Sequence, residues 1–198
     1  MTRKKQDTAE VTVLKIDTTT MTVCVVGSTP LLCNSMSAKV KQGLLIPPKS
    51  KNKTEKETTL KHDPLQEYRA SIYRAKSDDA ETLLVFPGGG MKKAIAQAAV
   101  DIPGAAKAQI GRLCHVKEID IPVYGIPQLH MDVVRQAGQG KAPDVRTRAI
   151  VPEWATMFSV SFVRPNLSEE TVANLIAAAG LIVGIGDGRP EKGALAFG

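Results

Sequence analysis

The glycine-rich tail is the first segment whose residue types suggest a chemistry. It combines Gly184, Gly186 and Gly193 with two cations, Arg189 and Lys192. Glycines let backbone N–H groups approach phosphate oxygens closely, and the cations attract a polyanion. A glycine-rich turn that only lets two backbone segments pack together is the alternative, because one such loop is a weak motif.

A second run of glycines follows Pro87, between an expected strand at 82–86 and an expected helix at 91–100. A glycine loop before a helix N-terminus can bind an anion. Lys92 and Lys93 oppose the helix dipole in its first turn, which a bound phosphate would explain. The segment lacks the G-x-x-x-x-G-K-[ST] spacing, so nucleotide hydrolysis of the P-loop type is not supported. A turn with two solvated lysines, or a small nucleotide-binding enzyme, stays open as an alternative.

Lysine dominates residues 39–61, where seven lysines against two glutamates give a net charge of +5. Leu60 is the only large apolar side chain between residues 47 and 63, so this segment cannot bury enough surface to offset its ordering entropy. We expect a solvated basic loop that either contacts a polyanion or serves as a plain linker. The basic residues that we assign to polyanion contact outside the glycine-rich segments are Lys49, Lys51, Lys53, Lys56, Arg146 and Arg148.

The histidines and cysteines show no catalytic or metal-binding spacing. The three cysteines lack a CxxC pair, and the histidines form no HxH or HExxH pattern. No G-x-S-x-G motif is present. We therefore expect no catalytic residue, metal or cofactor. One histidine acting as a general base in RNA cleavage stays open as an alternative, and no pattern selects among His62, His115 and His130.

Composition narrows the class of protein. Of the 198 residues, 43% are hydrophobic and 23% charged, which predicts one folded domain over 1–198. Only 4% are aromatic, so few rings are present to stack on bases. No apolar run approaches the ~20 residues that span a bilayer, and no apolar segment follows the basic N-terminus. These features, with the odd cysteine count, predict a cytoplasmic protein. The net charge of +6 permits a polyanionic partner.

The residues that could bind phosphate must be positioned by a small set of elements. Ser168 is an expected N-cap before two glutamates, and Gly180 is the expected end of that helix. Asp63-Pro64 is an expected start of a helix, and 102–112 is expected to be irregular. The elements left after two insertions, at about 28–86 and 125–152, are strand 11–26, helix 91–100, strands 115–124 and 154–163, helix 168–179 and strand 181–198.

This order is β-α-β-β-α-β, and it predicts an α+β fold of the ferredoxin-like type, also called split βαβ or RRM-like. An antiparallel sheet of four strands would carry both helices on one face, because both crossovers are right-handed. The RNA recognition motif, which binds single strands on its sheet, has the same architecture.

The element order and the tail together resemble the RAMP superfamily, the ferredoxin-like backbone and processing subunits of CRISPR effectors. Those proteins carry a G-h-G-(x)n-G-x-h-G loop near their last strand, which resembles Gly184-Ile185-Gly186 followed by Gly193 to Gly198 here. The motif covers fifteen residues, and the fold-level likeness covers about half of the chain. Large insertions are also similar to those of the backbone subunits. A small stand-alone phage protein fits the resemblance equally well.

The resemblance implies a non-catalytic protein that binds single-stranded RNA or DNA. It also implies a homo-oligomer along the strand, or a subunit of a ribonucleoprotein. One alternative is a metal-independent endoribonuclease of the RAMP type. A structural protein whose insertions grip neighbouring subunits, without nucleic acid, is another.

Overall fold

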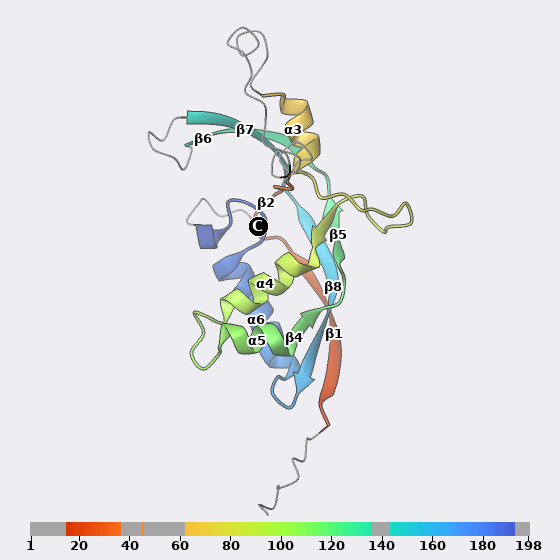
Figure 1. Ribbon diagram of the computed structural model, residues 1–198, viewed down its shortest axis with the longest axis vertical. Coiled ribbons are helices and arrows are strands. Elements are labelled where there is room, and N and C mark those ends of the chain that lie inside the picture. The colour runs from red at the N-terminus through yellow and green to blue at the C-terminus, as the bar shows by residue number, and fades with distance from the viewer. Residues whose placement is uncertain (1–14, 37–44, 46–61, 136–142, 193–198) are drawn as a thin grey trace, which may run out of the picture.

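Two antiparallel sheets, one layer of helices and a separate helix form the core of the part of the chain that the computed structural model describes, residues 15–36, 45, 62–135 and 143–192 (Figure 1). The larger sheet has the strand order β1-β8-β5-β3, and β4 also pairs with β8. Its strands are β1 (Asp17–Val26), β3 (Val85–Pro87), β4 (Cys114–Val116), β5 (Asp120–Gly125) and β8 (Trp154–Arg164).

Strand β1 shows why this sequence forms a sheet with two different faces. Its exposure alternates along DTTTMTVCVV, with Met21, Val23 and Val25 half-buried and the residues between them exposed. Val23 lies opposite Phe158 of β8, one of the most deeply buried side chains in the chain. Alternating β-branched residues favour a strand with one covered face.

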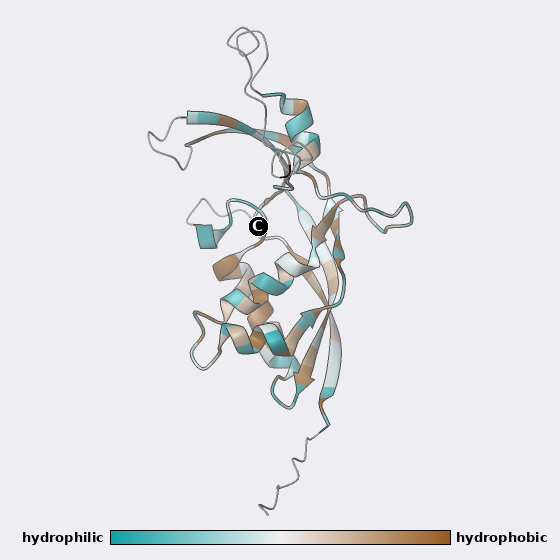
Figure 2. Cartoon of the chain, viewed as in Figure 1, coloured by the Kyte–Doolittle hydropathy of each residue, from teal (hydrophilic) through white to brown (hydrophobic). Residues whose placement is uncertain are grey.

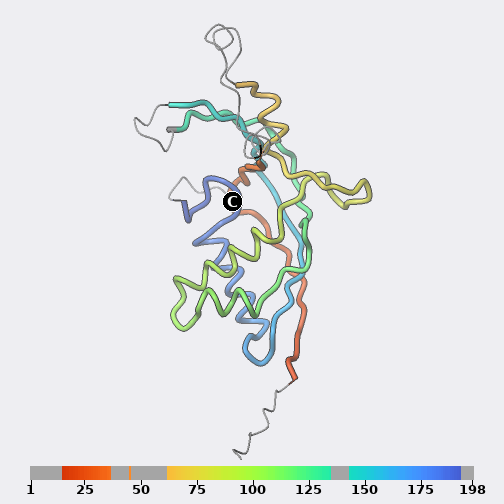
Figure 3. Tube along the Cα trace, in the orientation of Figure 1, coloured from red at the N-terminus to blue at the C-terminus, as the bar shows by residue number. Residues whose placement is uncertain are grey.

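The smaller sheet consists of β2 (Leu31–Leu32), β7 (Pro143–Val151) and β6 (Gln128–Arg135), in the order β2-β7-β6. Two residues separate β5 from β6, and two separate β7 from β8. The same pair of chain segments therefore runs from the larger sheet into the smaller one, as the tube in Figure 3 shows.

The helices α4 (Gly88–Ala98), α5 (Lys107–Leu113) and α6 (Glu169–Ala178) lie together on one face of the larger sheet (Figure 1). Apolar side chains from these helices and from the sheet form one core, which includes Ile95, Val172 and Phe158. Figure 2 shows the apolar residues on these helices and strands. At α6 the Ser168 side chain accepts from the Thr171 N–H at 3.1 Å, which satisfies a donor of the first helical turn.

Helix α3 (Pro64–Ser71) covers part of the free edge of β7. The carboxylate of Glu67 accepts from the Thr147 N–H at 3.2 Å, and the Ser71 hydroxyl accepts from the Ala149 N–H at 2.8 Å. Four residues of a helix rise about 6 Å, close to the rise of two residues of a strand. The spacing of the two helical side chains therefore matches alternate N–H groups of the strand and satisfies them.

Several predictions from the sequence are confirmed. The chain is mixed α and β with antiparallel sheets, and strands occur within the expected 11–26 and 154–163 segments. The helices expected at 91–100 and 168–179 lie on the same face of the sheet (Figure 1). Asp63 caps α3 through a bond from the Gln66 N–H to its carboxylate at 3.0 Å.

The prediction of a last strand at 181–198 is wrong for residues 181–192, the part of this segment that the structure describes. Residues Ala179–Val183 continue α6 as a π-helix, and Pro190–Lys192 form a 3-10 turn. Gly180 does not end the helix. The first positive φ after α6 is 68° at Gly184, whose N–H bonds the carbonyl of Ala179 at 2.8 Å. The ferredoxin-like strand order is consequently not confirmed.

Three local predictions also need correction. The segment expected to be irregular contains α5, whose buried Ile110 anchors it against the core. The strand expected at 115–124 is split into β4 and β5 by residues 117–119. The insertion expected at 125–152 contains a paired hairpin rather than short strand pieces, with Gln128 opposite Ile150 and Arg135 opposite Pro143.

Candidate functional site

A cavity of about 350 Å³ lies between α4 and the glycine-rich tail. Its inner wall is apolar, and its polar groups come from four separate parts of the chain. The lining residues used below are Asn34, Tyr73, Phe86, Lys93, Ala94, Gln97, Val183, Ile185, Asp187, Arg189, Glu191 and Lys192.

The glycines after Pro87 form the first turn of α4 rather than a loop before it. Gly88 is buried, and its N–H donates to the carbonyl of Ile119 at 2.8 Å. A Cβ at Gly88 would lie 1.9 Å from the carbonyl oxygen of Glu118. Only glycine therefore lets the helix begin this close to the chain entering β5, and that start orients Lys93 at the cavity.

The tail loop turns through three glycines with positive φ: 68° at Gly184, 81° at Gly186 and 67° at Gly188. The N–H of Asp187 donates to the carbonyl of Leu32 at 2.9 Å, so the loop is bonded to β2. A Cβ on Gly186 would lie 2.6 Å from that same carbonyl oxygen. Gly186 thus lets the tail loop pack closely against the backbone of β2. This packing is the alternative to phosphate binding that the sequence left open.

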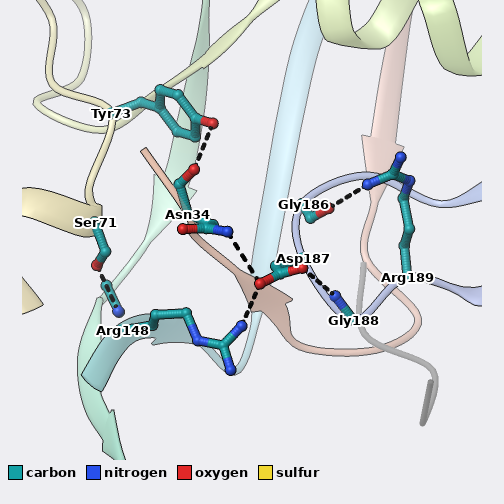
Figure 4. Close-up of polar contacts among 9 residues, drawn as sticks. Asn34, Ser71, Tyr73, Arg148, Gly186, Asp187, Gly188 and Arg189 are labelled. Carbon is teal, nitrogen blue, oxygen red and sulfur yellow. Dashed lines mark hydrogen bonds and ion pairs between the residues drawn. The ribbon is translucent and has the colours of Figure 1, made fainter. Parts of the chain in front are cut away.

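Asp187 holds the loop in place through its side chain (Figure 4). One carboxylate oxygen accepts from Asn34 Nδ2 at 3.1 Å and from the Arg148 guanidinium, and the other accepts from the Gly188 N–H at 3.1 Å. The side chain of Arg148 is one-tenth exposed. Its positive charge is balanced by Asp187 within the protein. We therefore remove Arg148 from the expected polyanion contacts.

Arg189 is also engaged by its own loop. Its Nη1 donates to the carbonyl of Gly186 at 3.0 Å, and its Nε and Nη2 donate to a carboxylate oxygen of Glu191 at 3.1 and 3.0 Å. These bonds shape the turn and balance the charge of Glu191. If Arg189 contacts phosphate as expected, its guanidinium must give up some of its bonds to Gly186 and Glu191, or bond the phosphate in addition to them.

Lys93 and Lys192 are exposed at the rim of the cavity. Lys92, in contrast, is half-buried and places its Nζ 3.0 Å from Nδ1 of His115. Arg146 is exposed on β7 opposite Asp132 and does not line the cavity. The structure thus brings together Lys93 from one glycine-rich segment and Lys192 from the other. Five of the residues assigned from sequence lie outside the described ranges: Lys49, Lys51, Lys53, Lys56 and Gly193.

Three polar or aromatic side chains at the cavity, those of Asn34, Tyr73 and Gln97, were not predicted from the sequence. Tyr73 lies in an irregular segment after α3 and donates through its hydroxyl to the carbonyl of Asn34 at 3.0 Å. Burial raises the pKa of the Tyr73 hydroxyl, with smaller contributions from Cys33 and Asp187, so it stays protonated. Gln97 joins them from α4. Their positions are unrelated in sequence, so only the folded chain shows that they are neighbours.

Two histidines are committed to internal bonds. Nε2 of His115 lies 3.0 Å from the carbonyl of Arg112, so this nitrogen donates, and Nδ1 accepts from Lys92. His62 lies between two carboxylates, with Nδ1 2.6 Å from Glu67 and Nε2 3.0 Å from Asp144. Neither imidazole therefore offers a free basic nitrogen to a substrate.

The thiols of the two buried cysteines are also unsuited to chemistry. Burial raises the pKa of both Cys33 and Cys114 to about 11, so each is protonated at neutral pH. Across the described ranges, no group of three His, Cys, Asp or Glu side chains is placed to hold a metal ion. Nor does any helix in these ranges have both the length and the apolar character needed to span a membrane.

The His62 bridge predicts a pH-dependent stability. The hydrogen bond to Glu67, followed by that to Asp144, raises the pKa of His62 above its ordinary value of 6.5. Because the folded-state pKa is the higher one, the stabilisation is complete below pH 6.5 and is lost as the pH rises through the folded value. Urea unfolding of wild type and His62→Gln should show a stability difference that shrinks as the pH rises above 6.5. A difference independent of pH would contradict a charged bridge.

The chain matches no protein-family model and has no significant match among curated proteins. The resemblance to the RAMP superfamily therefore rests on the glycine-rich tail and on an expected element order whose last strand is absent from the described residues.

Proposed function

We propose that this chain is a non-catalytic protein that binds single-stranded nucleic acid and that the cavity beside α4 is part of its binding surface. One observation carries the proposal. Lys93 and Lys192, 99 positions apart in the sequence, lie at the rim of the same cavity. Each belongs to a glycine-rich segment that was assigned to phosphate contact on separate grounds.

The charges around the cavity support an anionic ligand. Asp187 is paired with Arg148, and Glu191 is paired with Arg189. Among the described residues, the ammonium groups of Lys93 and Lys192 make neither an ion pair nor a hydrogen bond. Two unbalanced positive charges thus remain at the rim. The helix dipole adds nothing to this argument, because α4 begins at Gly88 and Lys93 therefore lies in its second turn, not in the first turn that the sequence predicted.

The fold supports the finer part of the proposal, a relative of the RAMP proteins with a ferredoxin-like core. A split βαβ unit places a third strand between the two strands joined by its crossover. Here β8 lies between β1 and the β4 and β5 pair, and the connection from β1 to β4 includes α4. On this proposal, three strands and two helices correspond to the ferredoxin-like unit. The pairing of β3 with β5 lies outside that unit, and the fourth strand has no counterpart among the described residues.

We also propose that the chain forms the homo-oligomer implied by the resemblance, and an exposed apolar strip on β6 supports this. Leu129, Met131 and Val133 alternate along the strand and are 47%, 50% and 66% exposed. β6 is also an edge strand of the smaller sheet. An edge strand with exposed apolar side chains is a natural contact for a second protein chain.

The salt dependence of binding tests the proposed function. Each phosphate contact with a single strand contributes about −0.7 to the slope of log K against log salt concentration. The double variant Lys93→Ala and Lys192→Ala should therefore have a slope shallower by about 1.4 than wild type, with affinity lowered equally for every sequence. Fluorescence anisotropy of a labelled oligonucleotide over a series of salt concentrations measures the slope.

Two lysines away from the cavity provide the matched control. Lys76 and Lys117 are exposed and do not line the cavity. Changing both to alanine removes the same net charge and should leave the slope within error of wild type. An equal change in both double variants would show general electrostatic attraction without a site. Absence of binding by wild-type protein would reject the proposed function.

A further inference from the structure

We infer that the cavity beside α4 holds one unpaired nucleobase against Tyr73, with the rim lysines placed on the phosphates that flank it. The inference rests on the proposed function and deepens it. It adds a site that recognises the base to a surface that otherwise contacts only the nucleic-acid backbone.

The inner wall of the cavity suits a flat apolar group. Phe86, Ala94, Val183 and Ile185 are buried and line it from three segments of the chain. This wall offers contact area but no charge. A phosphate alone would gain nothing from it, so the ligand that fits the whole cavity has an apolar part as well as an anionic part.

Tyr73 provides a positioned aromatic ring at this wall. Its hydroxyl is bonded to the Asn34 carbonyl, which fixes the ring's direction (Figure 4). Its centroid lies 5.9 Å from that of Phe86, with 70° between the ring planes. Because this contact is edge-to-face, Phe86 is not stacked on the Tyr73 ring. A base in the cavity can therefore contact the ring, an interaction worth about 1–3 kcal/mol per stacked base.

Two amide side chains border the cavity and can bond the edge of a base. Asn34 uses one N–H on Asp187, which leaves its carbonyl oxygen and a second N–H. Gln97 accepts from Lys107 through its carbonyl oxygen, which leaves its amino group as a donor. Single-stranded bases are recognised by such bonds combined with stacking on aromatic rings.

The size of the cavity favours one base rather than a longer stretch. Its volume of about 350 Å³ lies near the lower end of the roughly 300–1,000 Å³ found for small-molecule sites. A base can enter only when it is unstacked and unpaired. The proposed base site therefore predicts a preference for single strands, which phosphate contacts alone would not provide.

A pair of oligonucleotides with the same phosphates separates base recognition from backbone binding. One is a short oligothymidylate, and the other is an abasic strand of equal length. Wild-type protein should bind the oligothymidylate about 5- to 150-fold more tightly, the range that corresponds to one stacked base. Tyr73→Ala should reduce this preference towards onefold, whereas Tyr73→Phe should keep most of it. The salt slope should be the same in all three proteins.

A matched tyrosine serves as the control. Tyr124 is half-buried in β5 and does not line the cavity, so Tyr124→Ala should leave the preference for bases unchanged. A strand carrying 2-aminopurine, tested with wild-type protein, gives a second measurement that needs no variant. Stacking on Tyr73 should quench its fluorescence on binding.

The outcomes distinguish the two proposals. Equal affinity for the thymidylate and abasic strands, or 2-aminopurine that stays bright when bound, would overturn the base-binding cavity. The proposed function would survive that result if the Lys93 and Lys192 variant still changed the salt slope. Failure of wild-type protein to bind either strand would instead overturn the proposed function.

Discussion

Gly88→Ala is expected to lower the free energy of unfolding by about 2–3 kcal/mol, within the range for overpacked sites. The added Cβ would lie 1.9 Å from the backbone carbonyl oxygen of Glu118, which cannot move aside as a flexible side chain could. Helix α4 must shift, and Lys93 shifts with it. Urea unfolding should show the lost stability, and oligonucleotide binding by the folded variant should weaken.

The neighbouring glycine is the control for this prediction. A Cβ at Gly89 meets no atom within 4 Å, although Gly89 lies in the same turn of α4. Gly89→Ala should therefore leave binding unchanged and stabilise the protein by up to about 1 kcal/mol through helix propensity. Similar unfolding curves for the two variants would contradict the described contact between α4 and the chain entering β5.

Asp187→Ala is expected to cost about 2–3 kcal/mol of stability. Removing one partner of a buried ion pair typically costs about 3–5 kcal/mol, because the other charge is left buried alone. The lower value applies here because the side chain of Asp187 is 29% exposed, against 10% for Arg148. Chemical denaturation of wild type and variant measures the difference.

The partner residue tests whether the loss has this cause. In the double variant Asp187→Ala and Arg148→Met, the stranded charge is replaced by an apolar side chain of similar length. Much of the lost stability should return, because apolar replacement of a buried ion pair is often neutral. If Arg148→Met only added to the loss, the buried charge could not be its source.

The elements with complete local signals were the ones that the sequence predicted well. Ser168 followed by two glutamates marks the start of α6, and Asp63-Pro64 marks the start of α3. The end of α6 was misplaced because a glycine stops a helix only where its backbone adopts a positive φ. Gly180 and Gly184 look alike in the sequence, and the packing of buried Val183 carries the helix as far as Gly184.

The sequence predicted individual residues of the candidate site but not that they lie together. Lys93 and Lys192 were identified separately, since each stands in its own glycine-rich segment. Their proximity depends on how the tail loop bonds to β2, a contact between distant segments with no local pattern. Arg148 was assigned to polyanion contact from the sequence, but it does not belong to the site. Nothing in the sequence distinguishes it from a surface cation, and only the structure shows that it is buried beside Asp187.

The bonds of Asp187 also determine when during folding the binding surface can exist. They join the tail loop to Asn34, 153 positions earlier, and to Arg148 on β7. Contacts of such long sequence separation require closure of large chain loops. The cavity is complete only when the tail loop has docked on Asn34 and Arg148. On the proposed function, we therefore expect binding to begin only after these late contacts have formed.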